Sequence, residues 1–341
     1  MKTPVVSVIM AAYKGVGLVG ETIASVLAQT FTDFELVIVD DCSPDNTLDI
    51  LRNFDDSRIR VIGSPVNQGP VKTRNMAMAE ARGRYIAGLD QDDICLPYRL
   101  ERQVAYLDAH PEVVLVAAAA DLLEEGRIRP GYFRNETSPE FIRWQLHLQN
   151  MLVWSTVMMR ADVARRLDPI TRPEVLFAED FDLYHRISAF GTIARIDEPL
   201  LLYRIHPGGV SKTYQTVMVA NATRVLTDVY GPIFGADAAE SARLIIAHIA
   251  QGDPVPDRAT LQRIGAIIAK IRARGFAARD PLIDHAISRT WWRLVRTAIR
   301  AGRVSPATLV QPRPNTVRFS DLDWGDMLLS SMIGTARRVT A

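Results

Sequence analysis

Val5-Val6-Ser7-Val8-Ile9-Met10-Ala11-Ala12 is a nearly unbroken apolar stretch close to the start of the chain. A run of this length that is rich in β-branched residues is typical of a strand covered on both faces, as in a parallel sheet. A loop over residues 13–17 follows, and apolar residues then recur at positions 19, 23, 26 and 27, which is helical spacing. The sequence therefore predicts a buried first strand followed by an amphipathic helix.

The same alternation continues along the chain. Further strands are predicted at 34–39, 59–62, 85–89 and 113–120, with one or two closing strands within 193–205. Further helices are predicted at 46–54, 71–81, 97–109, 161–167 and 179–190, and the pattern is helical throughout from residue 216. Strands that alternate with helices through short connections form right-handed crossovers and a mainly parallel sheet. We therefore expect an α/β protein with a Rossmann-like sheet flanked by helices, followed by a mainly helical C-terminal region.

Composition is that of an ordinary soluble globular protein, with 48% hydrophobic and 23% charged residues among 341. The longest apolar run, residues 113–120, is much shorter than the roughly eighteen residues of a membrane span, so we expect no transmembrane segment. The N-terminal run leads directly into the strand pattern, which favours a strand over a signal peptide. We expect Cys42 and Cys95 to be free thiols and the protein to be cytoplasmic, with the inner face of the membrane as a peripheral location.

Three polar motifs come directly after predicted strands: Ala12-Tyr13, Asp40-Asp41 and Asp90-Gln91-Asp92-Asp93. Ligands of open parallel sheets bind outside the carboxyl ends of the strands, so these motifs are expected to lie at one binding edge. In an extended chain Asp90 and Asp92 point to the same side, and two carboxylates held together suit Mg²⁺ or Mn²⁺ with a diphosphate completing its shell. The alternative is an acidic loop in which one carboxylate caps the next helix.

Five motifs in this order resemble the inverting family 2 glycosyltransferases of the GT-A fold. They are residues 6–13 (VSVIMAAY), 25–31 (SVLAQTF), 35–45 (ELVIVDDCSPD), 67–69 with Arg74-Asn75, and 89–93 (LDQDD). The resemblance covers about residues 4–212. It implies a catalytic domain at 1–215, with a nucleotide-sugar-binding half at 1–96 and an acceptor-binding half at 97–215, before a helical region at 216–341.

The resemblance also implies a set of donor-binding residues. Asp41 would accept from the uracil imide, because a carboxylate only accepts hydrogen bonds. Tyr13 and the backbone of Ala12 would border the base, and Lys72 or Arg74 would contact the nucleotide. Asp92 would bind the metal, and Asp90 would assist the metal or bind the ribose, with Gln91 between them. For Asp40-Asp41 a helix-capping turn remains the alternative, and for Lys72 and Arg74 a solvated helix face.

Two later motifs are expected to complete the site. Phe177-Ala178-Glu179-Asp180 resembles the family's Glu-Asp motif, so Asp180, with Glu179 second, is the predicted base that takes the acceptor's proton. The alternative is that both acids only complement a helix N-terminus. Residues 203–212 resemble an Arg-x-His loop over the diphosphate, in which His206 would bind the metal or phosphate and Lys212 would supply a positive charge. Acceptor candidates are Trp154 and Ser155, with the core as the alternative for Trp154.

Charge is distributed unevenly along the chain. Residues 1–215 hold 23 Lys and Arg against 29 Asp and Glu, whereas residues 216–341 hold 17 against 10. Within the basic section, residues 281–303 form a predicted amphipathic helix with an apolar stripe at 287, 291, 294 and 298 and five arginines elsewhere. This helix is predicted to lie on an anionic membrane, or to pack against the catalytic domain or a second subunit. No nucleic-acid-reading motif accompanies the arginines.

The predicted function is metal-dependent transfer of a sugar, with inversion, from a nucleotide diphosphate to a saccharide or lipid-linked saccharide, as in bacterial surface polysaccharide synthesis. UDP is the favoured nucleotide, and Mn²⁺ or Mg²⁺ the expected cofactor. One alternative is an inactive sugar-nucleotide-binding scaffold. Another is a dinucleotide oxidoreductase, because Gly15, Gly17 and Gly20 match the G-x-G-x-x-G pattern.

Overall fold

The computed structural model describes residues 3–131, 136–206, 208–209, 213–276, 280–310 and 313–339. The chain divides into two compact units, one of residues 1–139 with 151–218 and one of residues 140–150 with 219–341. In the described part of the chain, no helix has the length and hydropathy needed to pass through a bilayer. Both cysteines are free, as predicted; Cys42 is exposed and Cys95 is buried.

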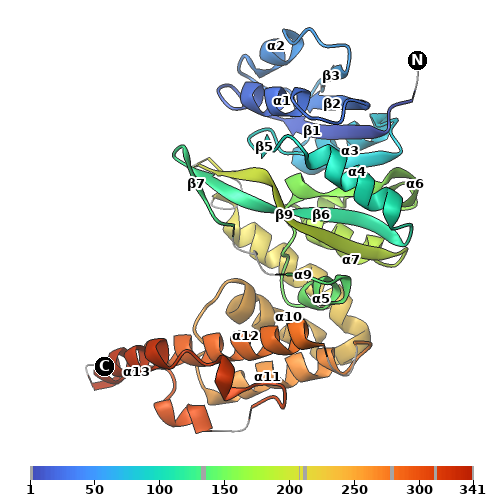
Figure 1. Ribbon diagram of the computed structural model, residues 1–341. Coiled ribbons are helices and arrows are strands. Elements are labelled where there is room, and N and C mark those ends of the chain that lie inside the picture. Colours follow the sequence, from blue (N-terminus) through green and yellow to red (C-terminus); the bar gives the residue numbers. More distant parts are fainter. Residues whose placement is uncertain are drawn as a thin grey trace. The chain divides into compact units, whose positions relative to one another are not determined.

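The first unit is built on a curled sheet in the order β3-β2-β1-β4-β8-β6-β9-β5, with β7 paired to β6 (Figure 1). Its strands are β1 (Val6–Ala12), β2 (Phe34–Asp40), β3 (Ile59–Gly63), β4 (Tyr85–Gly88), β5 (Ile94–Cys95), β6 (Val113–Glu124), β7 (Arg127–Arg129), β8 (Met158–Arg160) and β9 (Thr192–Ile205). The first four strands are parallel, and β8 enters antiparallel between β4 and β6. The predicted α/β class with a mostly parallel sheet is confirmed.

Helices cover this sheet because its strands are apolar on both sides. The helices of this unit are α1 (Val19–Leu27), α2 (Thr47–Arg52), α3 (Pro70–Glu80), α4 (Arg99–Ala109), α6 (Ala161–Ala164) and α7 (Glu179–Ile187). Every residue of β2 is buried. One core cluster joins alternate residues of β1, such as Val8 and Met10, to Ile23 of α1 and Leu107 of α4. The alternation of a strand thus places these residues under α1 and α4.

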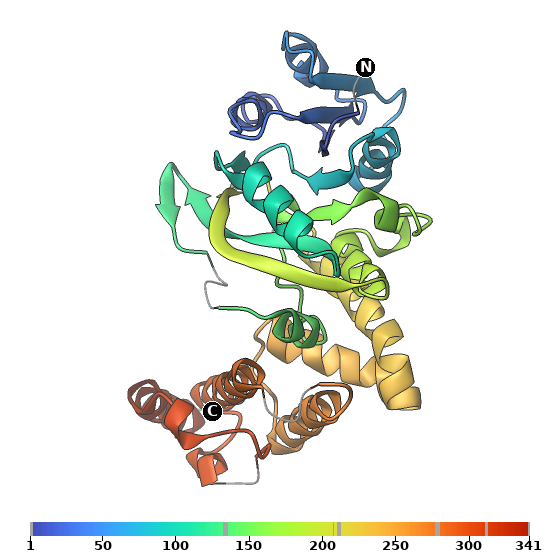
Figure 2. The same cartoon turned by 45° about the vertical axis from the view of Figure 1, so that its right-hand side comes forward.

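Two long strands carry the sheet beyond β8. β6 and β9 run parallel, from Val113 opposite Thr192 to Glu124 opposite Ile205, and they lie side by side in both views (Figures 1 and 2). β9 is a single strand, where the sequence pattern left one or two open. The short β5 pairs antiparallel with β9 at Leu201 and Leu202. Since β5 directly follows the acidic turn at 90–93, this pairing holds that turn beside the end of β9.

The second unit is helical, which confirms the predicted C-terminal region. It contains α5 (Pro139–Gln145), most of α9 (Gln215–Phe234), α10 (Ala238–Ile245), α11 (Arg258–Arg272), α12 (Pro281–Arg300) and α13 (Trp324–Val339). The apolar stripe of α12 is buried inside this unit; Trp291 and Trp292 are each only 4% exposed. The expectation that residues 281–303 offer this stripe to a membrane or a second subunit is corrected, because α11, α13 and the turn at Phe319–Asp321 pack against it.

Gly334 allows α13 to approach the end of α12. A Cβ at this position would lie 1.8 Å from the carbonyl oxygen of Ile299. We expect Gly334→Ala to destabilise the α12–α13 contact by about 1–3 kcal/mol, because backbone must move to admit the methyl group. Hydrogen–deuterium exchange of residues 324–339 measures this as faster exchange.

Gly325→Ala in the same helix is the matched control, because a Cβ there meets nothing closer than 3.5 Å. Alanine favours helix over glycine, so its exchange should stay the same or slow. Equal exchange in the two variants would contradict the proposed role of Gly334.

Candidate active site

The carboxyl ends of β1, β2 and β4 meet at one edge of the sheet. Ala12 lies opposite Asp40 in the β1–β2 register, and the Asp41 amide donates to the Ala12 carbonyl at 2.8 Å. On the other side of β1, the Leu89 amide donates to the Ile9 carbonyl at 3.1 Å. The three motifs that follow these strands are therefore neighbours in space.

The Asp40-Asp41 pair organises two loops. Asp40 accepts from the amide and hydroxyl of Ser43, at 3.0 and 2.6 Å. The buried Asp41 carboxylate accepts from the amides of Gln68 and Gly69, each at 2.9 Å. Gly69 has φ +86°, a conformation that favours glycine, immediately before α3 begins. Asp41 thus fixes the loop that leads into α3.

Gln91 joins the acidic turn to the loop after β1. Its side-chain oxygen accepts from the Tyr13 amide at 2.9 Å, and its side-chain nitrogen donates to the Tyr13 carbonyl at 2.8 Å. Gly15 leaves room for this amide, because a Cβ there would lie 2.6 Å from the Gln91 oxygen. The Tyr13 ring remains exposed beside this contact, while Ala12 is buried. Gln91 therefore fixes the backbone of Tyr13, whose ring is exposed at this edge of the sheet.

The acidic motif is a turn and not an extended strand. β4 ends at Gly88, so the expectation that Asp90 and Asp92 share one side of a strand is corrected. Asp90 approaches Arg74 at 3.2 Å, whereas Asp92 contacts the His206 ring nitrogen Nε2 at 2.8 Å. Asp93 is buried and accepts from the Arg204 amide at 2.9 Å. Each carboxylate has its own partner.

Burial changes the titration of this turn. It raises the pKa of Asp93 well above its ordinary value, and Asp92 and Asp90 raise that pKa further. Burial also raises the pKa of Asp90, a shift that Arg74 opposes. Both shifts favour the protonated form, and most strongly so for Asp93.

Arg74 of α3 is buried at the centre of the site. Its guanidinium contacts Glu179 at 2.6 Å and Asp90 at 3.2 Å, and lies over the Trp154 ring at 4.5 Å from the centroid. Although burial lowers the pKa of Arg74, the acids Asp90, Glu179 and Asp180 raise it above its ordinary value. Arg74 thus links the acidic turn after β4 to the start of α7. Lys72, two residues earlier, is exposed.

Trp154 and Ser155 lie beneath the carboxylates. Trp154 is 4% exposed and fills the space over Gly88, where a Cβ would lie 2.6 Å from its ring. Ser155 is fully buried, and its hydroxyl accepts from the Asp90 amide at 3.0 Å. Both side chains are buried against Arg74 and the acidic turn, as the core alternative for Trp154 expects, and their contact with an acceptor stays a prediction.

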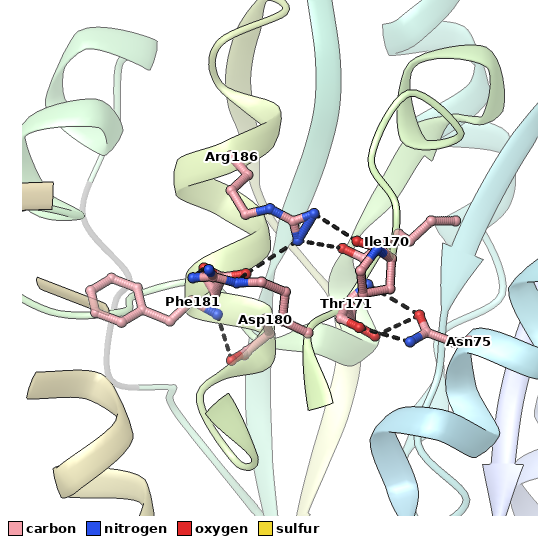
Figure 3. A network of polar contacts seen from close by, with 9 residues as sticks. Asn75, Ile170, Thr171, Asp180, Phe181 and Arg186 are labelled. Atoms are coloured by element: carbon pink, nitrogen blue, oxygen red, sulfur yellow. Dashed lines mark hydrogen bonds and ion pairs between the residues drawn. The ribbon is translucent and has the colours of Figure 1, made fainter. Parts of the chain in front are cut away.

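The start of α7 presents Asp180 at the site. Glu179 is buried and paired with Arg74, whereas Asp180 is half-buried and accepts from the Phe181 amide at 2.7 Å (Figure 3). Arg186 of the same helix donates to the carbonyls of Pro169 and Ile170, and the next residue, Thr171, is bound to Asn75 of α3. These contacts connect the last turn of α7, through residues 169–171, to α3.

Arg204 was not among the predicted site residues. Its amide binds Asp93, its side chain donates to the Asp92 carbonyl at 2.7 Å, and it pairs with Glu21 at 2.6 Å. The signal that pointed to it was the Arg-x-His pattern, of which only the histidine was assigned a role. Lys212, predicted at the end of the same loop, lies outside the described residues.

The described residues contain no group of three or more His, Cys, Asp or Glu side chains placed to hold a metal ion. Asp92 and His206 form a pair in which one carboxylate oxygen faces one imidazole nitrogen. Oxygen and imidazole donors suit Mn²⁺ and, for the carboxylate, Mg²⁺. This pair therefore fits an ion that takes its remaining ligands from water and a diphosphate.

Comparison with known proteins gives three informative matches. Residues 7–167 match the profile of Glycosyl transferase family 2. The Escherichia coli UDP-Glc:alpha-D-GlcNAc-diphosphoundecaprenol beta-1,3-glucosyltransferase WfaP is 32% identical over 209 residues, which are 60% of this chain and 79% of WfaP. S. aureus TarS 1–349 in complex with UDP-GlcNAc aligns with a TM-score of 0.58 at 18% identity, over 98% of this chain and 92% of that one.

A further structure, the mannosyltransferase PcManGT from Pyrobaculum calidifontis in complex with GDP-Man and Mn²⁺, aligns with a TM-score of 0.53 at 18% identity, over 88% of this chain and 87% of PcManGT. At these identities the two structures show the fold alone, whereas the relative matched over most of its length shows the family. The chain therefore belongs to glycosyltransferase family 2 and has the GT-A fold.

Proposed function

We propose that this glycosyltransferase is inverting and metal-dependent and moves a sugar from a UDP-sugar to a saccharide or lipid-linked saccharide. The observation that carries the proposal is the path of contacts from the acidic turn through Asp90, Arg74 and Glu179 to Asp180. It connects the predicted donor side of the site with a half-buried carboxylate at a helix start. Because the chain belongs to a glycosyltransferase family, we do not retain the dinucleotide oxidoreductase as an alternative.

The donor is proposed to lie along the edge formed by Tyr13, Asp41 and the acidic turn. Asp41 already accepts two amides, and a carboxylate has about four lone-pair sites, which leaves capacity for an imide N–H. UDP is favoured because TarS is described with UDP-GlcNAc and WfaP is named for UDP-Glc. The halves at 1–96 and 97–215 remain our proposal for donor and acceptor binding.

Asp92 and His206 are proposed to hold Mn²⁺ or Mg²⁺, as PcManGT is described with Mn²⁺. When bound, such an ion offsets charge on the departing diphosphate. Arg204 positions the pair, because it binds the Asp92 carbonyl and the neighbouring Asp93 carboxylate. Asp92 and His206 thus come from the turn after β4 and from the end of β9, which are far apart in sequence.

Asp180 is proposed to be the base. Glu179 is committed to Arg74, and a carboxylate in the first turn of α7 is stabilised in its ionised form by the helix dipole. A base on this side takes the proton of the acceptor hydroxyl while that oxygen attacks the anomeric carbon opposite the leaving diphosphate, which gives inversion. A lipid-linked acceptor is favoured because WfaP is named for a diphosphoundecaprenol acceptor.

Asp180→Asn should lower kcat by about 10²–10⁴-fold, because the amide cannot accept the proton. Donor affinity should stay unchanged, as measured by calorimetry with a UDP-sugar. The control is Asp162→Asn, an exposed acid on α6, which should keep full turnover. Undiminished turnover in Asp180→Asn would remove this residue from the mechanism, and donor binding without turnover in the wild type would support the inactive scaffold.

Arg74→Met should destabilise the protein by about 3–5 kcal/mol, because it leaves Glu179 buried without its cation. The double variant Arg74→Met with Glu179→Gln removes that charge and should recover part of the loss, so the two effects are not additive. Chemical denaturation of the wild type, of Arg74→Met, of Glu179→Gln and of the double variant measures this coupling. Strict additivity would show that the 2.6 Å contact contributes nothing to stability.

Removing divalent metal with EDTA should abolish turnover, and Mn²⁺ should restore it. In His206→Ala the Mn²⁺ concentration for half-maximal turnover should rise by about tenfold or more. Calorimetry of UDP with Mn²⁺ should show the same loss without depending on activity. His285→Ala, an exposed histidine in the second unit, is the control. Full turnover in EDTA would refute metal dependence.

A further inference from the structure

α13 has one face packed and one face open. Met327, Ser330 and Gly334 are buried at helical spacing, and this side meets α12. Asp326, on the flank of the packed side, is paired with Arg296 of α12. The contact to α12 therefore accounts for Met327, Ser330 and Gly334 but not for the other large apolar side chains of the helix.

The open face carries four large apolar residues. Trp324, Leu328 and Met332 follow one another at intervals of four residues and are 54%, 64% and 72% exposed, and Leu329 beside them is 49% exposed. From Trp324 to Thr335 this face has no charged residue. Single exposed apolar residues are normal on a protein surface. A contiguous stripe of four is characteristic of a surface that binds another molecule or a membrane.

Aromatic and cationic side chains extend this stripe. Phe319 stacks on Trp324 with ring centroids 6.1 Å apart, and the Arg313 guanidinium lies 4.1 Å from the Phe319 centroid. Arg318 and Arg337 are exposed near the two ends of the helix. Residues 281–341 contain nine arginines and four acids. The stripe is thus part of a segment with net positive charge.

We propose that the α13 stripe, defined as Phe319, Trp324, Leu328, Leu329 and Met332, docks this enzyme on an anionic lipid surface. An apolar helix face with exposed arginines near its two ends is suited to lie in the headgroup region, where the arginines meet anionic lipid and the tryptophan the interface. In a symmetric pair of chains the arginines of both copies would gather at one interface, which is unfavourable. This proposal rests on the proposed function, because a lipid-linked acceptor would be held at such a lipid surface.

The test is co-sedimentation of the full chain with vesicles of phosphatidylcholine alone or with about 30% phosphatidylglycerol. Wild type should bind the anionic vesicles, and Leu328→Glu with Met332→Glu should weaken this binding about tenfold or more. Ile128→Glu is the matched control, because Ile128 is 61% exposed in the first unit; it should bind like wild type. Both substituted positions are exposed, so circular dichroism should show unchanged folding.

Three outcomes would overturn the proposal. These are a wild type that stays in solution with anionic vesicles, a double variant that binds like wild type, and a dimer in sedimentation velocity that the double variant dissociates. In the last case a second copy covers the stripe. Vesicle binding is measured without donor or acceptor, so an enzyme that binds vesicles but transfers no sugar would refute the proposed function and leave the α13 stripe standing.

Discussion

A buried guanidinium between two carboxylates is the interaction on which the rest of the site depends. Arg74 reaches Asp90 in the turn after β4 and Glu179 at the start of α7, two segments that are 89 positions apart in the sequence. Burying one charge alone is costly, so each member requires the others. Trp154 covers the guanidinium and Gly88 leaves space for the indole, which excludes water from the pair. The relative position of turn and helix is therefore set by charge pairing and not by the sheet alone.

Much of the fold could be predicted because local pattern determines it. β1 and β2 are mainly apolar and β-branched along their length, which is typical of strands covered on both faces in a parallel sheet. The end of β4 could not be placed, because Leu89 and Asp90 continue the strand-like pattern while the backbone already turns to meet Ser155 and Arg74. The end of the strand is determined by contacts with residues distant in sequence, and the periodicity of the sequence contains no information on such contacts.

The packing of the helices in the second unit could not be predicted from sequence pattern for the same reason. α12 and α13 are both amphipathic, and an amphipathic pattern shows that a helix has an apolar side without showing what covers it. In α12 the tryptophans are buried, while in α13 the close approach at Gly334 turns the small residues inward and leaves Trp324 and Leu328 outside. The bulk of the side chains at the contact decides which face is packed. A search for apolar stripes alone therefore does not distinguish a packed helix such as α12 from one with an open face such as α13.

The distribution of partners among the acids has a chemical consequence. Asp90 and Glu179 share Arg74, Asp92 faces His206, and burial raises the pKa of Asp93. Each of these carboxylates is thus neutralised by a cation, positioned beside a ring nitrogen, or shifted toward its protonated form. Asp180, the proposed base, lies in the first turn of α7, where it accepts from the Phe181 amide and adds to the negative charge that raises the pKa of Arg74. Proton abstraction from a hydroxyl requires a carboxylate that a substrate can reach, and the half-buried Asp180 meets this requirement better than Glu179, which is buried and already paired with Arg74.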